Sequence, residues 1–323
     1  MPTPPSPAYL DSTMSKAVLL FSGQGAQKVG MGRDLVEAYP TALSLFEKAD
    51  EVLARPLTQI MFEGPSEDLT RTGNCQPALF LHGLSLLAVL QEKVPSLEPV
   101  AAAGLSLGEM TAHAAAGSFA FEDGLRLVAR RGELMDEACS ATSGTMAAMI
   151  GGSEEDVRRL ASDCDVDVAN LNCPGQLVLS GKVDGIEKAV SLAKEYGLRM
   201  GKKLSVAGAY HSRLMSGAQE KLANALVKAE IGTPSIPVIS NFLAEAAQGP
   251  DAIRASLTQQ VTGSVRWIES MQLLRSQGHD LFIELGPGKV LAGLMARIDK
   301  EAKIISIDDA SSLEVAVEEL QNF

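Results

Sequence analysis

The stretch PVAAAGLSLGEM, residues 99–110, contains a strand, a tight turn and the start of a helix. Apolar residues at 99–103 are typical of a short buried strand, and a helical pattern follows the turn. Between them, Gly104, Ser106 and Gly108 form the Gly-x-Ser-x-Gly pattern, in which the glycines permit a sharp turn that exposes the serine hydroxyl. Backbone N–H groups at the helix start can bind a developing oxyanion. Ser106 is therefore a candidate nucleophile; the alternative is a helix N-cap without catalytic role.

Strands and helices alternate on both sides of this stretch. An apolar strand is predicted at 17–21, and helices are predicted at 32–55, 77–93 and 122–138. Near the end, a strand at 280–285 precedes a closing helix. This alternation predicts an α/β core with a mostly parallel sheet.

Residues 145–206 show a different order of elements. The pattern predicts a strand, a helix, two strands, a helix and a strand, which is the βαββαβ arrangement of ferredoxin-like folds. Ser153 and Asp156 form a capping-box pattern that opens the first of these helices. We therefore expect a ferredoxin-like subdomain to be inserted into the α/β core.

The chain has 323 residues, enough for one large domain or for a domain with an insertion. We predict that residues 15–142 and 208–323 form the α/β core and that residues 143–207 form the inserted subdomain. The Pro- and Ser-rich residues 1–14 are expected to be a disordered lead.

Composition excludes several classes of function. The net charge of −12 argues against nucleic-acid binding, which requires a basic surface. The longest strongly apolar stretch, 77–90, is too short to span a bilayer, so no membrane segment is expected. The four cysteines are widely spaced without a Cys-x-x-Cys pair, which argues against a metal site and a disulfide framework. Reduced thiols and a cytoplasmic location follow as the expectation.

A serine nucleophile needs a general base, and the chain has four histidines. His113 follows Ser106 on the same helix at a distance of about 10 Å along the axis, so it cannot reach the hydroxyl. His82 lies in an apolar helical stretch, and His279 lies in a polar turn. His211 follows a strand and a flexible segment at a predicted helix start, which favours a neutral imidazole. By elimination His211 is the predicted base; the alternative is a helix-start histidine without catalytic role.

Arg131 lies in the apolar stripe of the helix predicted at 122–138, between Val128 and Met135. A guanidinium that faces the core needs an anion, because an unpaired buried charge is very costly. Two partners remain open from the residues alone. One is an internal carboxylate such as Glu109, and the other is a substrate carboxylate held by two parallel hydrogen bonds.

Two glutamines lie at segment ends, where polar residues are usually exposed. Gln24 follows the first strand, and Gln260 lies in the stretch QQVT, residues 259–262. No acidic residue outside the inserted segment clearly completes a triad between Ser106 and His211. We therefore expect a Ser–His dyad in which a backbone carbonyl orients the histidine.

Eight stretches between residues 21 and 294 resemble the malonyl-CoA:acyl carrier protein transacylase family in family order, and the resemblance extends from about residue 17 to the end. They are FSGQGAQKVGMGRDL (21–35), QPALF (76–80), GLSLGE (104–109), FEDGLRLVARRGELM (121–135), ANLNCPGQLVLSG (169–181), AYHSRLM (209–215), QQVTGSVRW (259–267) and IELGPGKVLAGL (283–294).

The resemblance implies a hydrolase-like α/β core with a ferredoxin-like insert. It implies that Ser106 is acylated, that His211 is its base and that Arg131 pairs with the malonyl carboxylate. The reaction would pass a malonyl group from malonyl-CoA through a malonyl-serine ester to the thiol of holo acyl carrier protein, in a ping-pong sequence that supplies fatty acid elongation. Coenzyme A would enter only as part of the substrate, with no cofactor or metal, and a monomer is expected.

The resemblance also assigns supporting roles. Gln24 and the backbone N–H of Leu107 would contact the oxyanion, and the backbone carbonyl of Gln260 would orient the histidine. One position departs from the family pattern, because most members have histidine where this chain has Leu105. A side chain at that position is expected to point away from the attacking oxygen.

Three rival functions share parts of these motifs: a serine thioesterase or hydrolase, a stand-alone acyltransferase for a polyketide or polyunsaturated-lipid synthase, and a non-catalytic binding module. Because the expected carrier and this chain are both acidic, docking would need a local basic patch. The candidates for this patch are Arg199, Lys202, Lys203 and Arg213.

Overall fold

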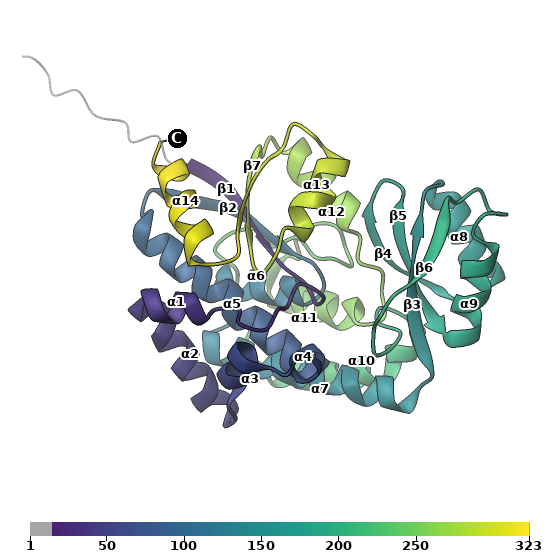
Figure 1. The fold of residues 1–323 in the computed structure, drawn as a ribbon, viewed down its shortest axis with the longest axis horizontal. Coiled ribbons are helices and arrows are strands. Elements are labelled where there is room, and N and C mark those ends of the chain that lie inside the picture. Colours follow the sequence, from purple (N-terminus) through teal and green to yellow (C-terminus); the bar gives the residue numbers. More distant parts are fainter. Residues whose placement is uncertain (1–14, 323) are drawn as a thin grey trace, which may run out of the picture.

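The computed structural model describes residues 15–322, and the predicted lead at 1–14 lies outside them. Within these residues the chain forms a parallel sheet with strand order β2-β1-β7-β8 and an antiparallel sheet with order β4-β5-β3-β6. Figure 1 shows the antiparallel sheet at one end of the molecule, beside the larger part that holds the parallel sheet. The predicted fold class, an α/β core with a ferredoxin-like insert, is confirmed.

The parallel sheet is covered on both faces by helices. Its strands are β1 (Ser15–Phe21), β2 (Leu97–Gly104), β7 (Leu281–Leu285) and β8 (Lys303–Ile307). Leu19 and Phe21 of β1 face one helix layer, and Val18 and Leu20 face the other, because side chains alternate along a strand. The first layer contains α5 (Thr72–Lys93), α6 (Leu107–Ala115) and α14 (Ala310–Gln321); the second contains α12 (Trp267–Ser276) and α13 (Val290–Ile298).

The single helix predicted at 32–55 is two helices, α1 (Arg33–Ala38) and α2 (Pro40–Leu53). Pro40 is the first residue of α2, and Tyr39 before it is extended. The break follows from proline chemistry, because the residue before a proline is disfavoured in helical conformation. The helix predicted to close the chain is followed by β8 and α14, which were not predicted.

Helix α5 begins earlier than predicted and contains Pro77. Proline lacks an N–H group, so the carbonyl of Gly73, four residues earlier, loses its helical partner. Arg55 Nη2 donates to this carbonyl at 2.6 Å and so replaces the missing bond. By length and apolar composition alone α5 could cross a membrane, yet 83% of its apolar window is buried inside the fold. Its place is that of a core helix.

The remaining core helices lie below the parallel sheet in Figure 1. They are α3 (Leu57–Glu63), α4 (Ser66–Thr70), α7 (Phe121–Ala141), α10 (Ser216–Lys228) and α11 (Gly249–Gln260). Between α10 and α11 the chain runs along β2, where Val238 forms an isolated bridge with Ala102.

The inserted subdomain has the predicted βαββαβ order. Its elements are β3 (Gly144–Ile150), α8 (Glu154–Asp163), β4 (Asp167–Cys173), β5 (Gln176–Lys182), α9 (Val183–Leu192) and β6 (Met200–Lys203). The predicted capping box of Ser153 and Asp156 opens α8. One sheet face packs on α8 and α9, whereas Met146 and Val178 on the other face join the large apolar cluster of the core. This second face is a wall of the site described next.

Candidate active site

Ser106 lies in the turn between β2 and α6, with φ 55° and ψ −104°. This backbone conformation is strained for a residue with a side chain. The glycines around it are required by close backbone approach. A Cβ on Gly104 would lie 2.0 Å from the carbonyl carbon of Gly108, and a Cβ on Gly108 would lie 2.2 Å from the carbonyl oxygen of Phe21. The turn therefore places the serine hydroxyl at the carboxyl end of the parallel sheet.

Asn241 holds this turn in shape. Its Oδ1 accepts the backbone N–H of Ser106 at 2.6 Å, and its Nδ2 donates to the carbonyl of Gly104 at 2.8 Å. The side chain is fully buried, so these two bonds replace water at both backbone groups. Asn241 was not predicted from the sequence. The available signal was its position directly after an apolar segment, where parallel-sheet proteins carry their functional residues.

The structure brings Ser106 and His211 together. Ser106 Oγ lies 2.7 Å from His211 Nε2, and His211 Nδ1 lies 2.8 Å from the backbone carbonyl of Gln260. Because a carbonyl only accepts, Nδ1 carries the proton and Nε2 is free to take the serine proton. Burial, and secondly the charge of Arg131, lower the pKa of His211 to about 4. The expected helix start is only the short 3₁₀ turn η1 (Arg213–Met215), so burial is the main reason for neutrality.

Arg131 reaches into the same site from α7. Its guanidinium is buried and donates to three oxygens: Gln76 Oε1 at 2.6 Å, Gln260 Oε1 at 2.9 Å and Ser106 Oγ at 3.1 Å. All three acceptors are neutral, and within residues 15–322 Arg131 forms no ion pair. Burial lowers its pKa to about 10, which still leaves it charged at neutral pH. The internal ion pair with Glu109, one of the two partners considered, is not formed.

Glu109 nevertheless lies close behind this arginine. Its Oε2 accepts the side-chain amide of Gln260 at 2.7 Å and the backbone N–H of Asn241 at 2.8 Å. Burial raises the pKa of Glu109 to about 7, although these hydrogen bonds and the charge of Arg131 oppose the rise. Gln260 therefore contacts the nucleophile, the base, the arginine and the carboxylate. From the sequence, only the backbone carbonyl of Gln260 was predicted to have a role.

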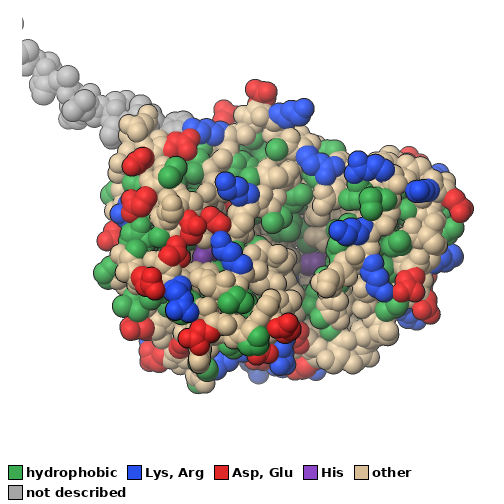
Figure 2. Space-filling view, in the orientation of Figure 1, with side chains coloured by type: hydrophobic (Ala, Val, Ile, Leu, Met, Phe, Trp, Pro, Cys, Tyr) green, Lys and Arg blue, Asp and Glu red, His purple; other side chains and the backbone are tan. Residues whose placement is uncertain are grey.

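The hydroxyl of Ser106 opens into a cavity of about 390 Å³ between the two sheets. Figure 2 shows this face of the molecule hollowed between its two parts, with several Lys and Arg side chains on the side of the antiparallel sheet. Residues from both parts line the cavity, among them Gln24, Gln76, Met135, Met146, Asn170, Asn172, Val178, Leu204, Tyr210 and His211.

Of the two residues predicted to contact an oxyanion, Gln24 is among the residues that line this cavity, and Leu107 is not. The side chain of Gln24 donates to Thr72 Oγ1 at 3.4 Å and to the hydroxyl of Tyr210 at 3.5 Å. Leu107 is the first residue of α6. Within the described part of the chain, the backbone N–H groups of Gln24 and Leu107 donate no hydrogen bond. Leu105 also lines the cavity, one residue before the nucleophile.

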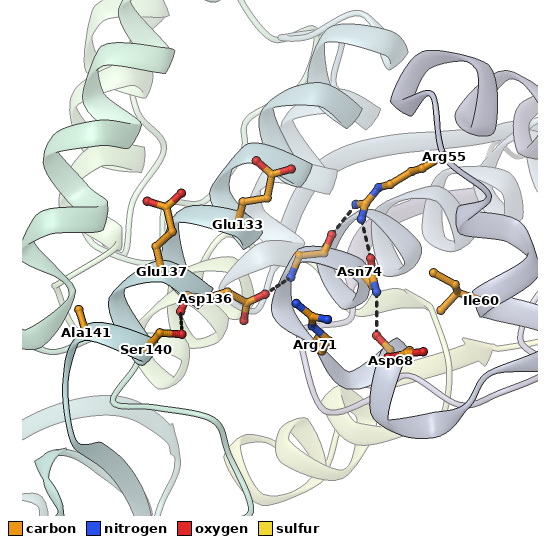
Figure 3. Close-up of a pocket in the computed structure, with 11 residues that line it drawn as sticks. Arg55, Ile60, Asp68, Arg71, Asn74, Glu133, Asp136, Glu137, Ser140 and Ala141 are labelled. Carbon is orange, nitrogen blue, oxygen red and sulfur yellow. Dashed lines mark hydrogen bonds between the residues drawn. The ribbon is translucent and has the colours of Figure 1, made fainter.

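A larger surface hollow, of about 980 Å³, lies apart from this chemistry (Figure 3). Arg55 and Asn74 on its wall bond each other, and Asp136 accepts the backbone N–H groups of Thr72 and Gly73 at the start of α5. The hydroxyl of Thr72 in turn lies 2.7 Å from that of Tyr210 in the catalytic cavity. The first turn of α5 thus separates the two spaces, and the hollow contains none of the predicted site residues.

Comparison with known proteins agrees with this geometry. The family model described as "Acyl transferase domain" matches residues 18–316. The malonyl CoA-acyl carrier protein transacylase of Bacillus subtilis (strain 168) is 41% identical over 313 residues, which cover 95% of this chain and 98% of that protein. The chain belongs to the malonyl CoA-acyl carrier protein transacylase family. The resemblance predicted from its motifs is therefore confirmed, and the protein is an acyltransferase.

Other transacylases of this family give the same result. The Haemophilus influenzae protein of the same name is 37% identical and covers 95% of this chain, with 99% of its own length matched. A solved acyl-carrier-protein-S-malonyltransferase from Bartonella henselae superposes with a TM-score of 0.89 at 37% identity, over 95% of this chain and 99% of that one. A malonyl-transacylase solved in complex with a type II PKS acyl-carrier protein superposes with a TM-score of 0.91 at 36% identity, over 94% and 100%.

Proposed function

We propose that this transacylase transfers the malonyl group of malonyl-CoA to the phosphopantetheine thiol of holo acyl carrier protein, through a malonyl ester of Ser106. The observation that carries the proposal is the position of Arg131. Its buried guanidinium lies 3.1 Å from the nucleophile and is held by neutral oxygens, so its charge is available to an anionic acyl group. The names of its relatives support the same substrates.

In the first half-reaction His211 Nε2 takes the proton of Ser106 Oγ as this oxygen attacks the thioester carbonyl. The N–H groups of Leu107 and Gln24 stabilise the oxyanion of the tetrahedral intermediate. The carbon–sulfur bond then breaks, and His211 returns the proton to the sulfur of coenzyme A. A malonyl-serine ester remains, and the low pKa of His211 keeps it available as a base at neutral pH.

Arg131 then exchanges partners. Esterification removes the hydroxyl proton of Ser106 and weakens its oxygen as an acceptor, whereas the malonyl carboxylate is a stronger one. Each charged hydrogen bond is worth about 1.5–3 kcal/mol. An acetyl group would leave the guanidinium without this partner, which gives selectivity for malonyl. In the second half-reaction the carrier thiol attacks the ester, and the same groups act in reverse.

The surface of β6 offers a docking position for the carrier. Lys202 pairs with Ala148, which also pairs with the cavity-lining Val178, so these three residues share the sheet face toward the cavity. Lys203 lies on the opposite face and pairs with Glu187 at 2.8 Å. Arg213 is bound by two aspartates and is not free. We therefore propose that Lys202 and Arg199 are the members of the predicted basic patch that meet the carrier.

We assign the transfer to fatty acid elongation, with service to a polyketide synthase as the second candidate. The second candidate has a specific basis, because one structural relative was solved with a type II PKS carrier. Transfer rates to purified fatty-acid and polyketide carrier proteins separate the two. A higher kcat/KM for the polyketide carrier would reverse the assignment.

Intact-mass measurement tests the reaction itself. After mixing with malonyl-CoA, the protein should gain the mass of one malonyl group, and Ser106→Ala should gain none. Added holo carrier should remove this mass and acquire it. Loss of the malonyl group to water at the same rate without carrier would instead indicate a thioesterase, and the absence of any mass gain would indicate a binding module.

A further inference from the structure

The mechanism above does not use Glu109, although it is a fully buried carboxylate directly behind the nucleophile. It is the third residue of α6, and its Oε2 accepts two hydrogen bonds, from the backbone of Asn241 and from the side chain of Gln260. A carboxylate in a protein interior is costly unless its charge is compensated. The cation that interacts electrostatically with Glu109 is Arg131.

The amide of Gln260 connects the two charged groups in one orientation. Its Nε2 donates to Glu109 Oε2 at 2.7 Å and to the backbone carbonyl of Ser106 at 2.9 Å, and its Oε1 accepts from Arg131 at 2.9 Å. In the reversed orientation the amide nitrogen would face a guanidinium, and the amide oxygen would face a carboxylate and a carbonyl. All three contacts would then be repulsive, so Glu109 and the carbonyl of Ser106 together fix which end of Gln260 meets Arg131.

In this arrangement the carboxylate that compensates the charge of Arg131 does not occupy the position where a substrate carboxylate would bind. A carboxylate in direct contact would satisfy Arg131 and compete with a substrate carboxylate. An amide oxygen holds the guanidinium more weakly, because hydrogen bonds between charged partners are roughly twice as strong as neutral ones. Glu109, one amide further away, still lowers the cost of burying the cation.

We propose that Glu109 is a positioning residue for the charged acyl group: it holds Gln260 in one orientation, keeps Arg131 beside Ser106, and supplies the negative charge that this buried cation needs while substrate is absent. The inference rests on the function proposed above and extends it to the residue that prepares the arginine for an anionic substrate.

Glu109→Gln tests the role of the charge, because the new carbonyl oxygen can still accept both hydrogen bonds. Two rates are compared: acylation of Ser106 by malonyl-CoA, and its reaction with an uncharged fluorophosphonate, which does not need Arg131. We expect the first rate to fall at least about tenfold more than the second. If both rates fall equally, as an unfolded turn would cause, the proposal is overturned. An unchanged rate of acylation by malonyl-CoA overturns it as well.

A swapped pair, Glu109→Gln with Gln260→Glu, provides a second test that conserves composition and charge. It brings the carboxylate into direct contact with Arg131, so malonyl acylation should be lost while the fluorophosphonate reaction falls less. A swapped enzyme with the wild-type malonyl rate overturns the proposal.

The matched control is Glu284→Gln, a fully buried carboxylate that caps α13 through Leu291 and Ala292. This variant should lose stability without changing the ratio of the two rates. Wild-type protein that malonyl-CoA does not acylate overturns the proposed function and this inference together. Acylated wild type with an unchanged Glu109→Gln variant overturns the inference alone.

Discussion

The carboxylate of Glu109 reaches the guanidinium of Arg131 through a single amide, that of Gln260, which donates to the first at 2.7 Å and accepts from the second at 2.9 Å. The carboxylate that interacts electrostatically with the arginine is therefore one amide away, and the atoms that hold the guanidinium at close range are neutral. This relationship excludes a direct ion pair with Glu109, one of the two partners that the sequence left open for Arg131, because the amide of Gln260 lies between the two groups.

Replacement of Arg131 by alanine should abolish the preference for malonyl-CoA. The loss of two charged hydrogen bonds predicts a fall in kcat/KM for malonyl transfer of about 10²- to 10⁴-fold. Transfer from acetyl-CoA should be retained or increase, because no unpaired cation remains beside the acyl group. Arg130→Ala is the matched control, since Arg130 lies on the exposed face of the same helix and pairs with Glu133. Unchanged malonyl kinetics in Arg131→Ala would contradict the assignment.

Replacement of Asn241 by alanine should disrupt the turn around Ser106. It leaves the N–H of Ser106 and the carbonyl of Gly104 buried without their partners, at about 1–3 kcal/mol each. Urea denaturation should show a loss of about 2–5 kcal/mol, and reaction of Ser106 with a fluorophosphonate should slow. Asn241→Asp keeps the acceptor but buries a second carboxylate against the carbonyl of Gly104, so it should lose at least as much stability at neutral pH. Wild-type stability in both variants would show that the turn holds its shape without this residue.

Charge reversal at Lys202 should weaken the interaction with the carrier. Lys202→Glu should raise KM for acyl carrier protein and leave the acylation rate with malonyl-CoA unchanged, because the residue lies at the edge strand β6 outside the catalytic cavity. Lys203→Glu carries the same charge change on the opposite sheet face, beside Glu187, and is the control. Equal effects of both variants on KM would place the docking surface elsewhere.

The pH dependence of acylation should distinguish His211 from Glu109. The base must be neutral, and the pKa of His211 is lowered to about 4, so its protonation reduces activity only near that pH. The pKa of Glu109 is raised to about 7. Arg131 is the charged group that interacts with both Glu109 and His211. As pH falls through about 7, the malonyl rate should decline, whereas the fluorophosphonate rate should stay level until much lower pH. A joint decline of both rates near pH 6.5 would contradict these assignments.

His82 should make the protein sensitive to acid. Both ring nitrogens are buried, without a hydrogen-bond partner among the described residues, and burial lowers the pKa to about 4. The unfolded chain takes up this proton below pH 6.5 and the folded chain does not, so stability is lost as pH falls from 6.5 toward 4. His82 alone should contribute a loss of about 2 kcal/mol at pH 5. In His82→Leu the fall in unfolding free energy between pH 8 and pH 5 should be smaller by this amount; an identical fall would refute the prediction.

The sequence predicted those parts of the site that local patterns encode. Gly104, Ser106 and Gly108 are close in sequence, and their spacing determines the turn. His211 could be found because the chain has few histidines. Arg131 was visible as a charge in an apolar stripe. In each case the type of one residue and its position in a local pattern were sufficient to predict that it belongs to the site.

The residues that the sequence did not reveal act through distant contacts. Gln76, Asn241 and the side chain of Gln260 are neutral polar residues, which are common at surfaces and carry no spacing signal. Their partners are separated by 55, 135 and 129 residues along the chain. The first and third pairs depend on how α5, α7 and α11 pack, and the second depends on how the segment before Asn241 runs along β2. Pro77 is a similar case, because its place inside α5 depends on Arg55.

The inserted subdomain lies in the chain between Ser106 and His211, which are 105 residues apart, and Gln260 follows a further 49 residues later. A growing polypeptide therefore exposes its serine long before the imidazole that activates it has been synthesised. Until His211 and Gln260 have been synthesised and folded against Ser106, the nascent chain holds an unreactive alcohol. Fragments that end before α11 lack Gln260, so they should not transfer acyl groups. An incomplete chain should therefore have no esterase activity.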